Sequence, residues 1–153
     1  MSAVGSQDAA ATGPGSAVAA APVRAWVHDE TLREGLQAPS VHDPEVAVKI
    51  RHLELLTVLG VQSVCIGMPA AHGRAAADAL ALLQHVARKR APLQLVCAAP
   101  MRESAVVQLE ALRQRSGQPL WANLFLSAAP ARCHLEGWSL SEVQRRLSHI
   151  LQA

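Results

Sequence analysis

The sequence predicts an α/β fold in which four parallel strands alternate with four helices. Short apolar runs alternate with longer amphipathic ones from Arg24 onward, and glycine and proline stand at the boundaries between them. Each strand–helix unit takes roughly thirty residues, and connections of that length join parallel strands through right-handed crossovers. The domain is therefore expected to span residues 24–153.

Composition agrees with a folded domain and argues against several other classes of protein. Half of the 153 residues are hydrophobic and 17% are charged, which is typical of globular chains. The net charge of +2 comes from scattered residues, and the chain has one phenylalanine and no tyrosine to stack on bases, so we expect no nucleic acid partner. No apolar run approaches the ~20 residues of a membrane span.

Two further features concern location. The three cysteines lie far apart and outside C-x-x-C pairs, which is typical of reduced thiols and predicts a cytoplasmic protein. Residues 1–23 are rich in Ala, Gly and Ser, and they lack the basic start and leucine-rich core of a signal peptide. We expect them to form a disordered tail.

The first half of the domain carries two predicted strands and two predicted helices. RAWVHD, residues 24–29, predicts the first strand, and the charged stretch HDETLREGLQAP, residues 28–39, continues from it as a loop. The first helix is expected to have Asp43 as its cap, Pro44 in its first position and Gly60 as its stop. Its apolar face repeats at helical spacing: Val46, Ile50, Leu53, Leu56 and Leu59. VQSVCI, residues 61–66, predicts the second strand, and an alanine-rich helix with Ala76, Leu80, Leu83 and Val86 follows.

The second half repeats this alternation. LQLVCA, residues 93–98, predicts the third strand, and a helix over residues 103–115 is expected to end at Gly117 and Pro119. LWANLFL, residues 120–126, predicts the fourth strand, and a long loop follows it. A last helix is expected within residues 139–152, where Ser139 and Glu142 form the pattern of a capping box.

Two architectures share this order of elements. One is an open doubly wound sheet, and the other is part of a (β/α)8 barrel, whose full length is typically ~250 residues. In both, ligands bind at the carboxyl ends of the strands. Asp29, Arg33 and Glu34 follow the first strand and are expected at this edge.

These charged residues suit a catalytic site. The Glu34 carboxylate offers hard oxygen ligands to Mg²⁺, Mn²⁺ or Zn²⁺. The Arg33 guanidinium can stabilise an enolate or hold a carboxylate, and Asp29 can orient it through a charge-assisted pair. Gly35 permits a close approach or a positive φ. A solvated, salt-bridged loop has the same residues, so composition alone leaves both interpretations open.

A family resemblance bears on this choice. DETLREGLQAP, an amphipathic helix and LGVQSVCIGMPAA together resemble the DRE-TIM metallolyase superfamily, particularly its pyruvate carboxyltransferase branch of 2-isopropylmalate and homocitrate synthases. That branch opens with D-x-T-L-R-[DE]-G-x-Q and carries G-V-x-x-I-E-x-G-x-P-A after its first helix. The similarity covers residues 24–152, and it implies a parallel (βα)4 half of a TIM-type barrel.

The resemblance also implies an activity and roles for four residues. The activity is a metal-dependent Claisen condensation of an acyl-CoA with a 2-oxo acid, followed by hydrolysis of the thioester. Glu34 would bind the divalent metal, Mg²⁺, Mn²⁺ or Zn²⁺, and Arg33 would stabilise the enolised or keto group. Asp29 would support Arg33, and Gln37 would contact the 2-oxo acid. No residue is assigned to another cofactor.

The chain also departs from the family pattern. Cys65 stands where the second strand has glutamate, and Met101 stands where the third has arginine, with Arg102 displaced by one position. Ser127 and His134 remain near the fourth strand without the family spacing. None of the seven histidines stands in H-x-H, the pair that supplies the family's other metal ligands on strand seven.

These departures leave an alternative and predict a partner. A truncated, catalytically incomplete half-barrel can serve as a binding or assembly module. We expect metal binding to be weak without a second half-barrel chain, or a second copy in a homodimer, because one carboxylate is a poor site by itself.

The remaining histidines and cysteines have simpler interpretations. His28 and His72 near strand ends can line a site or be polar loop residues. His52, His85 and His149 are expected on solvated helix faces, and Cys65 and Cys97 are expected to be buried structural thiols.

Overall fold

A computed structural model describes residues 25–71 and 73–152, so the tail predicted for residues 1–23 and His72 lie outside the described residues. The strands are β1 (His28–Asp29), β2 (Ser63–Cys65), β3 (Gln94–Pro100) and β4 (Trp121–Phe125). The helices are η1 (Gly35–Gln37, a 3-10 helix), α1 (Val46–Val58), α2 (Ala75–Lys89), α3 (Glu103–Ser116), α4 (Pro130–Glu136) and α5 (Leu140–Gln152).

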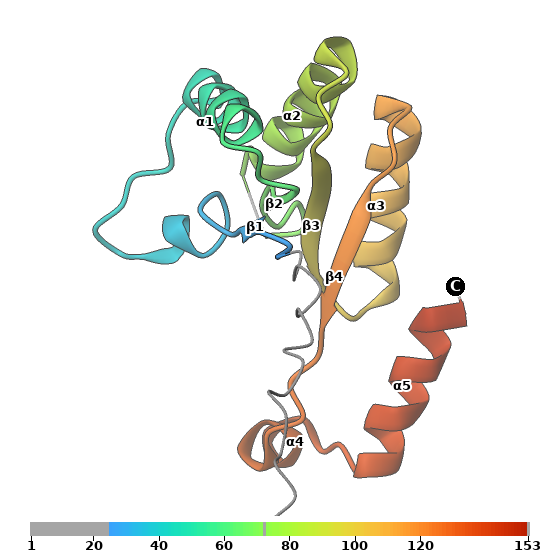
Figure 1. Cartoon of the computed structure of the whole chain (residues 1–153). Coiled ribbons are helices and arrows are strands. Elements are labelled where there is room, and N and C mark those ends of the chain that lie inside the picture. Colours follow the sequence, from blue (N-terminus) through green and yellow to red (C-terminus); the bar gives the residue numbers. More distant parts are fainter. Residues whose placement is uncertain (1–24, 72, 153) are drawn as a thin grey trace, which may run out of the picture.

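The four strands are parallel and lie in the order β1-β2-β3-β4, which confirms the predicted fold class. The register places His28 beside Ser63, Cys65 beside Val96, and Val96 beside Trp121. Neighbours in space are neighbours in sequence, as in a segment of a (β/α)8 barrel, whereas a doubly wound sheet reverses its order at a switch point. Figure 1 shows the strands with α1, α2 and α3 along one side of them.

The sheet has two faces of different character, because successive strand residues point to opposite sides. One face packs against α1, α2 and α3 through Val64, Leu95 and Cys97, which join Leu53 and Leu82 in the hydrophobic core. We call the opposite face the inner face. By register it carries His28, Ser63, Cys65, Val96, Trp121 and Phe125. Trp121 is 57% exposed and Phe125 46%, so the inner face is open at β4.

Several boundaries differ from the sequence prediction. The first strand has two residues rather than six. The predicted cap of the first helix is wrong: α1 starts after Glu45, because the Asp43 carboxylate pairs with Lys49 and Arg74 instead. The loop predicted after the fourth strand contains α4, which begins with Pro130 and ends at Glu136, before Gly137.

The predicted end and start of two later helices are confirmed. Gly117 follows α3 with a left-handed φ of 64°, a conformation that favours glycine. The Glu142 amide donates to the Ser139 hydroxyl at 3.2 Å, as expected for a helix cap. The Glu142 carboxylate turns to Arg145 and Arg146. None of the helices in the described part of the chain is long and apolar enough to cross a membrane.

Candidate functional site

The loop after β1 folds into a tight turn at the carboxyl edge of the sheet. The amides of Arg33 and Glu34 both donate to the Glu30 carbonyl, at 3.0 and 2.8 Å, and η1 follows. Leu32 is buried in the hydrophobic core and anchors this turn to the domain. Arg33 and Glu34 are therefore held at the edge where the sequence predicts them.

The Arg33 side chain is held between two carboxylates of its own loop. Its Nε donates to Glu30 Oε2 at 2.7 Å, and its Nη1 pairs with Glu34 Oε1 at 2.5 Å. The side chain is 18% exposed. The hydrogen bond to Glu30 raises the pKa of Arg33 above its usual range. A fully charged guanidinium with a defined direction therefore stands at the site.

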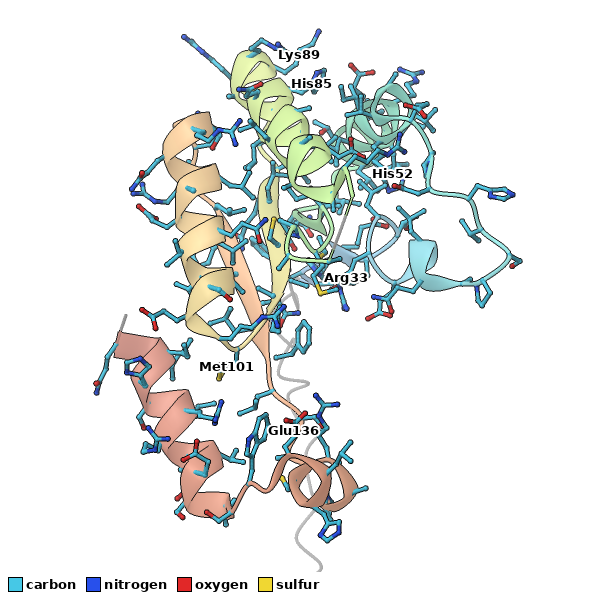
Figure 2. All side chains as sticks on the ribbon, turned by 180° about the vertical axis from the view of Figure 1, so that it is seen from behind. Arg33, His52, His85, Lys89, Met101 and Glu136 are labelled. Atoms are coloured by element: carbon cyan, nitrogen blue, oxygen red, sulfur yellow. The ribbon has the colours of Figure 1, made fainter. Side chains whose placement is uncertain are left out.

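The expected pairing of Asp29 with Arg33 is wrong, since Glu30 occupies that place. Asp29 follows His28 in the strand, so its side chain points toward α1, where it accepts from His52 Nε2 at 3.1 Å. It also accepts from the amide and hydroxyl of Thr31, at 3.1 and 2.9 Å. Figure 2 labels Arg33 in this loop and His52 on α1. His52, predicted on a solvated face, instead ties α1 to the end of β1.

Three carboxyl groups of this region have a pKa below the usual value. Burial acts to raise the pKa of Asp29, but hydrogen bonds from His52 and Thr31 outweigh it, and the net pKa is lowered. Burial also acts to raise the pKa of Glu30, yet the bonds from Arg33 and His28 lower it overall. For Asp43, pairing with Lys49 and Arg74 likewise outweighs the effect of burial and lowers the pKa. All three are ionised at neutral pH.

We therefore expect the folded protein to lose stability in acid. A carboxylate whose pKa is lowered by folding stabilises the protein fully above its unfolded pKa, and this contribution is lost as the pH falls through the folded pKa. The ordinary values are 3.8 for Asp29 and Asp43 and 4.5 for Glu30, so the loss begins near those values and deepens below them. Urea midpoints measured from pH ~6 to ~2 would show this fall, which Asp29→Asn should reduce. A midpoint that stays level over this range would contradict the expectation.

Gln37 and Arg33 line a cavity of about 450 Å³ at the carboxyl ends of β1 and β2. Its wall is mostly apolar, formed among others by Leu36, Ile66 and Met68. Lys49 and Asp78, both buried, form its polar floor and pair at 2.7 Å. Neither was predicted as a site residue, since their contact joins positions 29 apart in the sequence.

The described residues around Glu34 do not form a complete set of metal ligands. The Glu34 side chain is 55% exposed and is paired with Arg33. Within residues 25–71 and 73–152, no group of three His, Cys, Asp or Glu side chains is arranged to hold a metal ion. Firm sites for Mg²⁺ or Mn²⁺ take several oxygen ligands. The described residues alone therefore do not fit a metal site, and Glu34 offers one ligand only.

The other strands carry the predicted departures. Cys65 is buried on the inner face, and burial above all raises the pKa of its thiol. Burial also raises the pKa of Cys97, which lies on the opposite face in the core. Gly67 leaves β2 with a φ of 120°, where other residues are strained, so the chain needs glycine to turn beneath the loop. Met101 follows β3 directly, and its amide donates to the Phe125 carbonyl at 2.9 Å.

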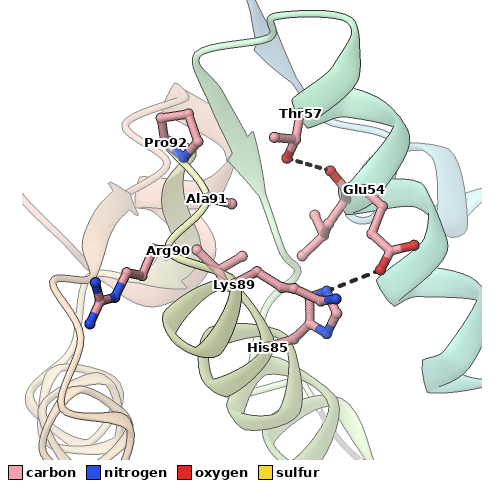
Figure 3. A pocket seen from close by; sticks show the side chains of 9 residues that line it. Glu54, Thr57, His85, Lys89, Arg90, Ala91 and Pro92 are labelled. Carbon is pink, nitrogen blue, oxygen red and sulfur yellow. Dashed lines mark hydrogen bonds and ion pairs between the residues drawn. The ribbon is translucent and has the colours of Figure 1, made fainter.

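A second cavity lies at the amino-terminal edge of the sheet, between the ends of α1 and α2 (Figure 3). It measures about 360 Å³ and is lined by Glu54, Thr57, His85 and Lys89, among others. His85 Nε2 is 3.4 Å from Glu54 Oε1, and Thr57 donates to the Leu53 carbonyl at 2.8 Å. Because the amino-terminal edge of a parallel α/β sheet mainly serves stability whereas ligands bind at the carboxyl edge, we favour the cavity beside Arg33 as the candidate site.

The chain was compared with family models and with curated protein sequences, and none of them matches it.

Proposed function

We propose that this chain supplies the 2-oxo acid side of a C-acyltransferase site of the 2-isopropylmalate and homocitrate synthase type. The observation that carries the proposal is the charged Arg33, fixed at the carboxyl edge of a parallel sheet beside Gln37 and a cavity of about 450 Å³. Ligands of such sheets bind at this edge. The motif that resembles the family is the segment that builds this arrangement.

Arg33 has the chemistry that the condensation requires. Within the described part of the chain its ion pairs use Nε and Nη1, which leaves Nη2 to face a ligand. In the proposed reaction a general base supplied by the second half removes the α-proton of the acyl-CoA. The resulting enolate carbon bonds to C2 of the oxo acid, and the carbonyl electron pair moves to oxygen. The guanidinium stabilises that charge, and Gln37 can donate to the substrate carboxylate. After this oxygen is protonated, water hydrolyses the thioester and releases the free thiol of CoA.

The proposal requires groups beyond those that residues 25–71 and 73–152 bring together. Glu34 can join a divalent metal as one ligand, and the remaining ligands must come from another segment or chain. We expect isothermal calorimetry on this chain to show little Mn²⁺ binding, and Glu34→Ala to leave the titration unchanged. Micromolar Mn²⁺ affinity that Glu34→Ala abolishes would contradict this, and would make the chain a metal site by itself.

One observation favours the alternative of a binding or assembly module. β4 is an edge strand, and its inner-face side chains Trp121 and Phe125 are exposed. Parallel strands are normally covered on both faces, and unpaired strand edges attract further strands. In this alternative the open β4 face holds a partner and the loop performs no chemistry.

Association is expected under both proposals, and activity with a second half-barrel separates them. Light scattering on the purified chain is expected to show a dimer or larger species at micromolar concentration, and Phe125→Lys should weaken it, because the added charge lies on the open face. A soluble, folded monomer would contradict the expected association. Adding a second half-barrel that carries an H-x-H pair is then expected to give condensation of acetyl-CoA with a 2-oxo acid. A stable homodimer that remains inactive under these conditions would favour the assembly module.

A further inference from the structure

We propose that Glu30 is a positioning residue that fixes the direction of Arg33, and that His28, Ser63 and Trp26 hold Glu30 in place across the inner face. The part of this inference that concerns substrate rests on the proposed function. The part that concerns the orientation of Arg33 stands on the contacts alone.

The contacts form one continuous chain of hydrogen bonds. The indole Nε1 of Trp26 donates to Ser63 Oγ at 3.0 Å, and Ser63 Oγ lies 2.8 Å from His28 Nδ1. On the other side of the ring, His28 Nε2 lies 3.1 Å from Glu30 Oε1, and Glu30 Oε2 accepts from Arg33 Nε at 2.7 Å. Both oxygens of Glu30 are therefore engaged by side chains, one on each side.

This series of hydrogen bonds holds Arg33 more firmly than the local salt bridge with Glu30 could by itself. Glu30 and Arg33 are three residues apart, and an exposed pair of that kind contributes little by itself. The Glu30 side chain is only 28% exposed, however, and through His28 it is tied to Ser63 on the neighbouring strand. The direction of the guanidinium is therefore fixed by β2, a buried strand, as well as by the loop itself.

The order Ser63, His28 and Glu30 resembles a nucleophile–base–acid arrangement, but the burial excludes that use. Ser63 is 2% exposed, and its oxygen already accepts the indole N–H of Trp26. A nucleophile must reach its substrate. The series of hydrogen bonds from Trp26 to Glu30 therefore serves to hold Arg33.

Cys65 gives the inference a sharp test. The thiol lies on the inner face two positions beyond Ser63, next to both Glu30 and Arg33. Burial is the main reason that the pKa of Cys65 is raised, and the nearby Glu30 carboxylate adds to it. We expect a carboxylate introduced at position 65 to lie close enough to the guanidinium to accept a hydrogen bond from it when Glu30 is replaced. Glu30→Gln should therefore release Arg33, and Cys65→Glu added to Glu30→Gln should hold it again.

The experiment follows the Nε–H of Arg33 by ¹⁵N NMR in the purified chain. In the wild type we expect slow exchange of this proton with water, and in Glu30→Gln an exchange about tenfold faster, since the charged acceptor is lost. Glu30→Gln with Cys65→Glu should restore most of the protection. The matched control is Glu110→Gln, which removes an exposed carboxylate three residues from its own arginine, Arg113, and should leave the Arg33 signal unchanged.

The outcomes separate this proposal from the proposed function. An Arg33 signal that Glu30→Gln leaves unchanged would overturn the positioning role. If the double variant does not fold, His28→Gln replaces it, because loss of the ring that holds Glu30 should speed the same exchange by a smaller factor. Pyruvate added to the wild type is expected to shift the Arg33 signal, with an affinity about tenfold weaker in Glu30→Gln. Fast exchange in Glu30→Gln together with no response to pyruvate would support the positioning role and contradict the 2-oxo acid site.

Discussion

Asp78→Ala is expected to lower the free energy of unfolding by about 3 kcal/mol or more. Asp78 and Lys49 are both buried, and their Oδ2 and Nζ atoms lie 2.7 Å apart between α2 and α1. Removal of the carboxylate leaves the ammonium of Lys49, whose side chain is only 7% exposed, without its buried partner. Asp43 remains 2.6 Å from it, but Asp43 is about half exposed and compensates only in part.

The matched double variant distinguishes a buried charge from lost packing. Lys49→Met with Asp78→Leu removes both charges while keeping similar volumes, and buried pairs replaced in this way often cost little. We expect its urea midpoint to lie much closer to the wild type than that of Asp78→Ala. As a surface control, Glu110→Ala breaks an exposed pair with Arg113 and should change stability by about 0.5 kcal/mol or less. Equal losses in the single and double variants would show that packing, not the unpaired charge, determines the cost.

If the proposed acyltransferase forms with a second half-barrel, Arg33→Lys is expected to lower its kcat/KM by about 100-fold or more. The guanidinium pairs with Glu30 and Glu34 at the same time, through Nε and Nη1, and in the proposed reaction its third nitrogen would contact the substrate. A lysine ammonium is a single point charge on a flexible stem, so it cannot hold both carboxylates and also present a fixed donor to the oxo acid.

The control for this prediction is Arg51→Lys on α1. Arg51 pairs with Glu54 three residues away and is exposed, so the same chemical change should leave kcat/KM unaltered. Thermal melts of both variants check that the difference reflects the site rather than the fold. A reconstituted Arg33→Lys enzyme with wild-type kcat/KM would remove Arg33 from the proposed reaction.

Most of the fold could be predicted because its signals are local. The buried run of β3 and the helical spacing of α3 are both bounded by proline or glycine, and both elements have nearly the predicted limits. The errors arise where a distant residue decides. Asp43 is a good cap by composition, but Lys49 and Arg74 take its carboxylate once α2 packs beside α1. α4 was missed because seven residues are too short to show a helical period.

The site was predictable in position but not in its contacts. The motif identified Arg33, Glu34 and Gln37 at the carboxyl edge, because the loop follows a strand directly. Strand alternation could also have predicted that Asp29 points away from the inner face, since His28 and Asp29 must face opposite sides of the sheet. The contact of His52 with Asp29 spans 23 residues, and no local pattern in the sequence encodes it.

The shortness of β1 bears on how the site responds to binding. The first loop is tied to the sheet by the two residues of β1 and by the Val27 carbonyl, which accepts from the amides of Gln62 and Ser63. Within positions 30–45, Leu32 is the buried residue. β3, by contrast, has seven residues with buried side chains at its centre. Amide hydrogens of the loop should therefore exchange through local opening, at a lower free energy than those of β3, which exchange on global unfolding. Ordering the site and folding the domain are separate equilibria, so a substitution in this loop can weaken ligand binding while leaving the melting temperature unchanged.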